Sequence, residues 1–288
     1  MSALSRSAGL AVALVTHNSE RDLSRFLEGQ LAAAHLVGAP LVVADNASVD
    51  GTLRLLRAAA RSHSSLVVCE MGRNAGYSAA VNAAFRQVPR RDVLLINPDV
   101  ELVDPQPLLA LAGVLERMPQ VAIAAPRLIG DDGEVQPTAR LFPSLAAMIG
   151  STGIGRILPF LARRYERFVE PSRSHDPLTV DWVIGAAMMI RRKAFEQVGG
   201  WDEGFFLYIG DTEFCRACIR AGWDVVYVPQ ISVRHRYPRA SRTTGSFTTS
   251  SARRNHVAGL GRLWTKEPRL VLGLGRGAPR RLDLGPPG

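Results

Sequence analysis

The fold is decided by the stretch VLLINPD at residues 93–99, in which four apolar residues are followed by Asn97-Pro98-Asp99. Four consecutive apolar residues are typical of a strand buried on both faces of a parallel sheet. Because proline cannot continue the hydrogen-bonded ladder, the strand ends there and Asp99 emerges at the carboxyl edge of the sheet. Open α/β sheets bind ligands at that edge. Asn-Pro-Asp is also good turn chemistry, so the stretch alone is compatible with a plain turn or a ligand site.

Strand-like and helix-like segments alternate along the first hundred residues and are joined by short loops. Buried strands are predicted over 10–15, 41–44, 66–68 and 93–96, with amphipathic helices between them. This alternation predicts an α/β fold with a parallel, doubly wound sheet.

After Asp99 the regular alternation breaks. Helices are predicted over 108–115, 193–198 and 213–221, and strands over 121–125, 180–191 with a break at Gly185-Ala186, and 225–228. From Pro268 onward glycine, proline and arginine dominate, which predicts a flexible tail over 268–288.

The composition is that of a globular protein with an excess of positive charge. The 288 residues carry a formal net charge of +9, which favours an anionic partner, and arginines are concentrated after residue 233. No nucleic-acid-binding motif accompanies them, so we expect no nucleic-acid partner. No stretch has the roughly 18 apolar residues that span a bilayer, and no signal-peptide pattern is present, which predicts a cytoplasmic location. Cys215 and Cys218 are predicted to be half-buried helix residues, since no second pair completes a zinc site.

Polar residues follow each of the first four predicted strands, at 16–18, 45–46, 74–76 and 97–99. In a parallel sheet these loops lie along one edge. Each loop alone could be only a helix cap or a turn. Together they offer what a nucleotide diphosphate requires, namely an acceptor for the base, amides for the ribose and carboxylates for a divalent metal.

The order of these motifs resembles that of the inverting family-2 glycosyltransferases, and most closely the bacterial rhamnosyltransferase branch. The similarity is carried by THN at 16–18, DNASVDG at 45–51, NAGY at 74–77 with Asn82, NPD at 97–99, GGWDE at 199–203, FFLY at 205–208, Asp211 and His235. It implies a GT-A fold, with a Rossmann-like, mostly parallel sheet and an acceptor-side α+β half. The implied catalytic domain covers 1–242, with a nucleotide-binding half over about 1–100 and an acceptor half over about 101–242. A basic helical segment would follow over 243–267.

The resemblance also implies roles for individual residues. Donor contacts are implied for Thr16, Asn18, Asp45, Asn46, Asn74, Gly76, Asn97, Gly185 and Ala186. Asp99 matches the last residue of the metal-binding triplet, and His235 would add a contact to Mg²⁺ or Mn²⁺ or to the diphosphate. Asn97 stands where the family has its first acidic residue of the triplet, and it is expected only to help position the donor. His17 and the other histidines have no such positional support and are interpreted as surface or packing residues.

Asp211 matches the catalytic base of the family, and it can also cap the helix that follows it. A positioned carboxylate that takes the proton of the attacking hydroxyl accelerates such reactions by about 10²–10⁴. Trp182 and Glu213 are assigned to the acceptor side, although a core role for Trp182 is equally compatible with the sequence. Gly210 departs from the family pattern, because a second acidic residue usually precedes the base. That departure puts the acceptor and the level of activity in question.

The resemblance therefore implies transfer of a sugar, with dTDP-rhamnose as the leading donor, to a polyprenyl-linked glycolipid or a polysaccharide precursor. A sugar nucleotidyltransferase is the first alternative, but it requires a glycine-rich basic loop that residues 16–19 do not provide. A non-catalytic nucleotide-sugar binding module is the second. The late basic patch, with Leu260, Leu263 and Trp264 nearby, predicts peripheral binding to the anionic inner face of the plasma membrane.

Overall fold

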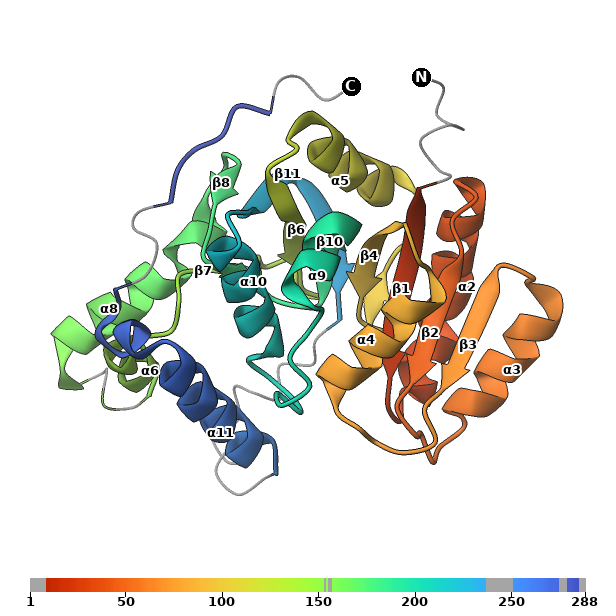
Figure 1. Ribbon diagram of the computed structural model, residues 1–288, viewed down its shortest axis with the longest axis horizontal. Coiled ribbons are helices and arrows are strands. Elements are labelled where there is room, and N and C mark those ends of the chain that lie inside the picture. Colours follow the sequence, from red (N-terminus) through yellow and green to blue (C-terminus); the bar gives the residue numbers. More distant parts are fainter. Residues whose placement is uncertain (1–8, 153, 155–156, 237–250, 275–278, 285–288) are drawn as a thin grey trace.

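The computed structural model describes residues 9–152, 154, 157–236, 251–274 and 279–284. Within these residues, a mixed sheet runs through the centre in the order β3-β2-β1-β4-β10-β6-β11-β5, and β8 pairs with β11 on its side (Figure 1). Helices cover both faces of this sheet, so it is buried on both sides.

The first half of the sheet is the parallel, doubly wound unit that the sequence predicts. Its elements are β1 (Leu10–Thr16), α2 (Glu20–Leu36), β2 (Leu41–Asp45), α3 (Thr52–Ser62), β3 (Leu66–Glu70), α4 (Tyr77–Gln87) and β4 (Asp92–Ile96). Strand β1 lies between β2 and β4 and pairs with both in parallel, with Thr16 beside Asp45. All of β1 is buried, because alternate side chains enter the cores on the two faces. The polar ends of β1, β2 and β4 therefore meet at one edge.

The second half is built around long strands with an antiparallel insertion. It contains β5 (Val100–Glu101), α5 (Gln106–Arg117), β6 (Val121–Ile129), β7 (Ala139–Arg140), α6 (Leu145–Gly150), α8 (Pro159–Val169), η1 (Glu170–Arg173), β8 (Leu178–Thr179), β9 (Trp182–Val183), β10 (Ala187–Ile190), α9 (Arg192–Val198), α10 (Gly210–Arg220) and β11 (Asp224–His235). Strand β10 joins the halves, because it runs antiparallel between β4 and β6. Strands β7 and β9 form a separate two-stranded sheet.

The predicted strand over 180–191 is divided into β9 and β10 at the expected glycine-alanine break. Strand β9 pairs with β7, whereas β10 enters the central sheet, so the chain changes sheets between Val183 and Ala187. This change leaves the backbone N–H of Gly185 outside both ladders, where it donates to the Asp211 carboxylate.

The C-terminal region differs from the expected flexible tail in the residues that the structure describes. Helix α11 (Ser251–Lys266) continues into η3 (Pro268–Leu272), where Leu270 is buried. Farther along, Leu282 donates its backbone N–H to Pro177, and Thr179 donates its own to Arg280. Apolar packing and backbone hydrogen bonds hold these segments, although their composition is typical of disorder.

Helix α11 turns both of its leucines toward the protein, which corrects the membrane contact predicted for them. Leu260 and Leu263 are buried in the core, and the Trp264 indole N–H donates to Pro143. The N-terminal part of the basic segment, 243–250, lies outside the described residues. Cys215 and Cys218 are fully rather than half buried on α10. None of the helices in the described part of the chain is long and apolar enough to cross a bilayer.

Candidate active site

The loops after β1 and β2 are joined by a buried carboxylate. Asp45 accepts hydrogen bonds from the Thr16 hydroxyl (2.9 Å) and from both the backbone N–H (2.9 Å) and the hydroxyl (2.5 Å) of Ser48. Across the same gap, Asn18 accepts from the backbone N–H of Val49 at 2.8 Å. These bonds hold Ala47 at φ 59°, a left-handed conformation that costs energy in a residue other than glycine. The loop is therefore fixed by side chains rather than by its own backbone preference.

A second network joins the loops after β2 and β3. The Asn46 amide donates to the Asn74 side-chain oxygen at 2.9 Å, and Asn46 accepts from the backbone N–H of Ala75. Asn74 also accepts from the backbone N–H of Gly76. Because these backbone groups can only donate, they fix the orientation of both amides.

His17 belongs to this network, although the sequence indicated only a surface or packing role. Its Nδ1 lies 2.9 Å from the backbone oxygen of Asn46, and its Nε2 lies 3.2 Å from the Asn74 amide nitrogen. A carbonyl oxygen can only accept, so Nδ1 carries the proton and Nε2 accepts from Asn74. His17 is exposed and therefore also faces the space in front of the loops.

The structure brings Asp99 and His235 together from positions far apart in the chain. The last residues of β11 pair antiparallel with β5, so that His235 lies beside Val100. The His235 Nε2 is 3.3 Å from an Asp99 carboxylate oxygen, and both side chains are largely buried. The backbone N–H of Arg236 donates to the Asp99 carbonyl and holds the same register.

Gln136 binds both the backbone and the imidazole ring of His235, a role that the sequence did not indicate. The Gln136 amide nitrogen donates to the backbone oxygen of His235 at 3.0 Å, which leaves its side-chain oxygen 2.7 Å from Nδ1. That oxygen can only accept, so Nδ1 donates to it and Nε2 is directed toward Asp99. An imidazole nitrogen that has lost its proton and a carboxylate oxygen together form a donor set that suits a divalent cation such as Mg²⁺ or Mn²⁺.

This pair would supply only part of a coordination shell. Among the described residues there is no group of three or more histidine, cysteine, aspartate or glutamate side chains arranged to hold a metal. Asn97 is occupied otherwise, because its side-chain oxygen accepts from the Tyr77 hydroxyl at 3.3 Å. The remaining ligands of a metal at Asp99 and His235 would therefore be water and the oxygens of a diphosphate.

Tyr77 connects the loop that carries Asp99 with the segment that holds Asp211. Its hydroxyl lies 3.3 Å from the Asn97 side-chain oxygen and 3.2 Å from the Gly185 carbonyl oxygen. The Gly185 N–H in turn donates to Asp211 at 3.0 Å, and the Ala186 carbonyl accepts from the backbone N–H of Asn97. A tyrosine where phenylalanine would be more usual is the one sequence signal that could have indicated this bridge. One phenol therefore lies between the loop after β4 and the segment between β9 and β10.

Asp211 lies at the start of α10 and is held by backbone donors. One carboxylate oxygen accepts from the Gly185 N–H and the other from the Thr212 N–H at 2.8 Å. Burial raises the pKa of this carboxyl above its ordinary value, although both backbone bonds and the charge of Arg140 act in the opposite direction. A carboxylate with a raised pKa that still accepts hydrogen bonds is suited to take up a proton.

Gly210 has no room for the acidic side chain that the family usually carries there. A β-carbon at this position would lie 2.6 Å from the Ser78 hydroxyl oxygen and 3.3 Å from the Trp201 ring. The Ser78 hydroxyl is itself fixed, because it donates to the Phe205 carbonyl at 2.7 Å. The glycine at position 210 thus allows α4 to pack closely against the start of α10.

The two predicted acceptor-side residues are both buried. Trp182 is buried, its N–H donates to Leu141, and the Arg140 guanidinium covers its ring at 5.0 Å. The sequence left both a core role and an acceptor-side role open for Trp182, and this environment favours the core role.

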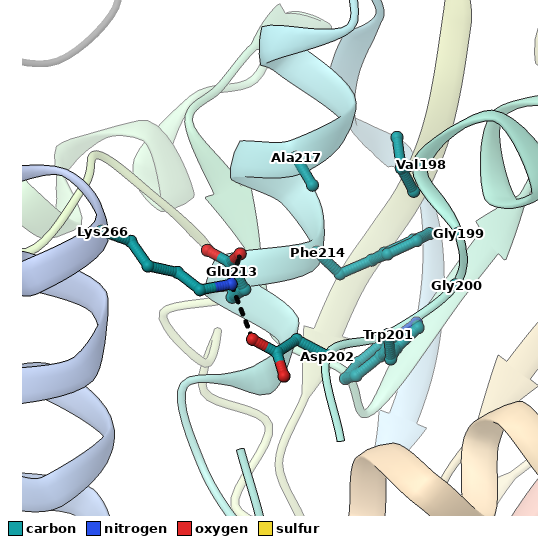
Figure 2. A pocket seen from close by; sticks show the side chains of 9 residues that line it. All are labelled: Val198, Gly199, Gly200, Trp201, Asp202, Glu213, Phe214, Ala217 and Lys266. Atoms are coloured by element: carbon teal, nitrogen blue, oxygen red, sulfur yellow. Dashed lines mark hydrogen bonds and ion pairs between the residues drawn. The ribbon is translucent and has the colours of Figure 1, made fainter. Parts of the chain in front are cut away.

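Glu213 is also buried and ion-paired. It binds Arg216 at 2.6 Å and Lys266 of α11 at 2.8 Å. Lys266 also binds Asp202 at 2.6 Å, the contact that Figure 2 marks with a dashed line. A small cavity of about 150 Å³ lies between the 198–202 loop, α10 and Lys266. Helix α10 is thus tied to α11 through Glu213 and Lys266.

Comparisons with known proteins show the family of the chain. Residues 8–256 match the family described as glycosyltransferase like family 2, and the chain belongs to that family. A curated relative from Mycobacterium tuberculosis is an N-acetylglucosaminyl-diphospho-decaprenol L-rhamnosyltransferase, 34% identical over 78% of this chain and 75% of the relative. A rhamnosyltransferase of Escherichia coli is 27% identical over 54% of this chain and 56% of its own length.

Solved structures show the same fold at low sequence identity. A Pyrobaculum calidifontis mannosyltransferase, solved with GDP-Man and Mn²⁺, superposes with a TM-score of 0.60 at 17% identity and covers 91% of this chain and 64% of its own. GalNAc-T7, solved with UDP, GalNAc and Mn²⁺, gives a TM-score of 0.63 at 16% identity over 90% of this chain and 48% of its own. The expected GT-A fold is therefore confirmed.

Proposed function

We propose that this protein is an inverting, divalent-metal-dependent transferase that moves L-rhamnose from dTDP-rhamnose to a hydroxyl of a polyprenyl-linked glycolipid or a related polysaccharide precursor. One observation carries the proposal: hydrogen bonds through Tyr77 and Gly185 join the side chain of Asn97, two residues before Asp99 of the Asp99–His235 pair, to the half-buried carboxylate of Asp211. The mycobacterial relative, named for rhamnose transfer to a decaprenol diphosphate glycolipid, supports this donor and acceptor class.

The donor would lie along the loops at the carboxyl edge of the parallel strands. We assign Thr16, Asn18 and Asp45 to the base, and Asn46, Asn74 and Gly76 to the ribose and diphosphate. Gly76 has φ 93° and no room for a side chain, because a β-carbon there would meet Phe206 at 2.7 Å. The hydrogen-bonded loops need little rearrangement to receive a ligand, which lowers the entropic cost of binding.

Asp211 would act as the general base in a single displacement. The acceptor oxygen attacks the anomeric carbon on the face opposite the diphosphate, the bond from that carbon to the diphosphate oxygen breaks, and the hydroxyl proton passes to an Asp211 carboxylate oxygen. A divalent ion bound at Asp99 and His235 would neutralise the charge that grows on the leaving diphosphate. Gly185 and Ala186 would line the space between donor and base.

An acceptor of this class is anchored in a bilayer. We therefore propose that the protein works peripherally at the inner face of the plasma membrane, with its donor drawn from the cytoplasm. We assign this attachment to a surface contact of the protein, and none of the described helices spans the membrane.

The test is incubation of the full chain with a panel of nucleotide sugars, with Mn²⁺, Mg²⁺ or a chelator, and with a short-chain polyprenyl diphosphate N-acetylglucosamine. We expect metal-dependent consumption of dTDP-rhamnose above all other donors, and a product whose anomeric configuration is opposite to that of the donor. Retention of configuration, or turnover undiminished by the chelator, would contradict the mechanism. Release of pyrophosphate from a nucleoside triphosphate and a sugar phosphate would identify a nucleotidyltransferase. Donor binding without turnover would identify a binding module.

A further inference from the structure

The chain between α6 and α8 exposes apolar side chains that the core does not use. Ile154, Ile157, Leu158 and Phe160 are all exposed, with Ile157 at 77% and Phe160 at 60%. They occupy seven positions of sequence, whereas Leu161 directly after them is buried. Single exposed apolar residues are ordinary on a protein surface, but a cluster of four marks a contact site.

The outer face of α8 continues this cluster with positive charge. Phe160, Arg163, Arg164 and Arg167 are spaced i, i+3, i+4 and i+7, so they share one face of the helix, and all are exposed. Glu166 lies off this face and binds Arg173 at 2.6 Å. We call Ile154, Ile157, Leu158, Phe160 and these three arginines the α8 surface.

Neighbouring elements extend the α8 surface with the same chemistry. Helix α6 packs against both α8 and η3, and it exposes Leu145. The 3-10 helix η3 exposes Arg269 and Leu272. In Figure 1, α6 and α8 lie together at one end of the molecule, and α3 and β3 lie at the other. The apolar and basic residues therefore gather at a single end.

We propose that the α8 surface docks onto an anionic phospholipid bilayer, a step that rests on the membrane-anchored acceptor proposed above. Apolar side chains flanked by arginines match the two layers of a membrane interface, because the former enter the acyl boundary and the latter bind the phosphates of the headgroups. The lipid phosphates supply the charge opposite to that of Arg163, Arg164 and Arg167. Leu260 and Leu263 of α11, which the sequence predicted to face the membrane, are buried, and the α8 surface takes that role instead.

The inner face of α8 leads to the acceptor side of the site. Phe168 packs on Trp182 with ring centres 6.2 Å apart, and the Arg140 guanidinium lies over both rings. Arg140 is near enough to Asp211 to lower the pKa of that carboxyl. A membrane against the outer face of α8 is thus separated from the base by one helix and one layer of side chains. A lipid-anchored acceptor could enter from this side while the donor occupies the opposite loops.

The experiment measures sedimentation of the full chain with vesicles of phosphatidylcholine, with or without phosphatidylglycerol, at low and high salt. We expect binding to the anionic vesicles that weakens with salt. Replacement of Ile157 and Phe160 together by serine should lower the partition coefficient by about tenfold or more. Each single substitution Arg163→Gln, Arg164→Gln or Arg167→Gln should lower it by about fivefold.

Matched controls come from elsewhere on the surface. Leu36→Ser removes a side chain that is 68% exposed at the end of α2, and Arg86→Gln removes an exposed charge on α4; neither should change vesicle binding. The proposal is overturned if the wild type ignores the charge of the vesicle, or if the α8-surface variants bind as well as the controls. It is also overturned if sedimentation velocity shows an oligomer that Phe160→Ser dissociates, because a second copy then covers this surface.

Hydrolysis of dTDP-rhamnose without lipid separates this proposal from the proposed function. The α8-surface variants should hydrolyse the donor as the wild type does and lose only transfer to an acceptor embedded in vesicles. Vesicle binding without hydrolysis by the wild type would refute the donor assignment and leave the docking surface standing. Hydrolysis without vesicle binding would refute the docking surface alone.

Discussion

The proposed donor side and the proposed acceptor side of the site are assembled in different ways. On the donor side, loops that directly follow β1, β2 and β3 bind one another through Thr16–Asp45 and Asn46–Asn74. On the acceptor side, Asp211 is held by Gly185 and lies near Arg140, which come from other parts of the chain. The difference shows that a regular sheet edge creates the first group, whereas the second depends on long-range packing.

The substitution Asp211→Asn tests the acceptor side most severely. The amide keeps the shape of the side chain but cannot take up the proton, so we expect the transfer rate to fall by about 10²–10⁴ with little change in donor affinity. Single-turnover kinetics and nucleotide titration measure the two effects separately. Glu213→Gln, on the same helix, should lower the melting temperature by breaking its ion pairs and leave the transfer rate within a few-fold of the wild type. Equal loss of rate in both variants would refute the assignment of the base.

The pH dependence of the rate should report the environment of Asp211. This carboxyl must be ionised to accept a proton, and burial raises its pKa, so the rate should fall as the pH drops through a value above the ordinary carboxyl range. Below that value we expect about a tenfold loss per pH unit. The charge of Arg140 lowers this pKa, so Arg140→Gln should move the acidic limb to higher pH. An unchanged limb in Arg140→Gln would contradict the electrostatic coupling.

Metal binding tests the contact between Asp99 and His235. Gln136→Ala removes the acceptor that keeps the His235 proton on Nδ1, so the affinity for Mn²⁺ should fall by about 10–100-fold. Calorimetric titration measures the affinity, and the ¹⁵N shifts of the His235 ring report the tautomer without any substrate. Gln230→Ala is the matched control, since this exposed glutamine bonds only the backbone of His175 among the described contacts. A change in affinity without a change in tautomer would show that Gln136 acts by packing.

The smallest expected effect concerns stability. Gly210→Ala should cost about 1–3 kcal/mol, because its β-carbon would press on the Ser78 hydroxyl and the Trp201 ring. Adding Ser78→Ala should recover part of the loss, which a double-mutant cycle in denaturant would measure. Gly261→Ala in α11 is the control, since a β-carbon there meets nothing within 4 Å and the better helix former should be neutral or stabilising. Equal losses of unfolding free energy at both glycines would show that a change in backbone freedom, rather than packing, causes the destabilisation.

The sequence was sufficient for the parallel half and for the gathering of Thr16, Asp45, Asn46 and Asn74 at one sheet edge, because both follow from strand ends that repeat locally. It could not reveal Gln136 or the bridging role of Tyr77, whose partners lie 99 and 108 positions away. It also misplaced Leu260 and Leu263, because an amphipathic helix can turn its apolar face to a core or to a membrane with the same pattern. The ordered segment after Pro268 was missed for the same reason, since its contacts are non-local.

The pairing of β11 with β5 has a consequence for the order in which the parts of the protein fold. His235 reaches Asp99 only when the end of β11 adds to the sheet edge, so this contact closes a loop of more than a hundred residues. Contacts of such sequence separation form late in folding. A chain emerging from the ribosome would therefore complete the loops after β1, β2 and β3 well before it could form the proposed metal site. Pulse-labelled hydrogen exchange during refolding should accordingly protect the amides of β1 and β2 before those of Arg234 and Arg236.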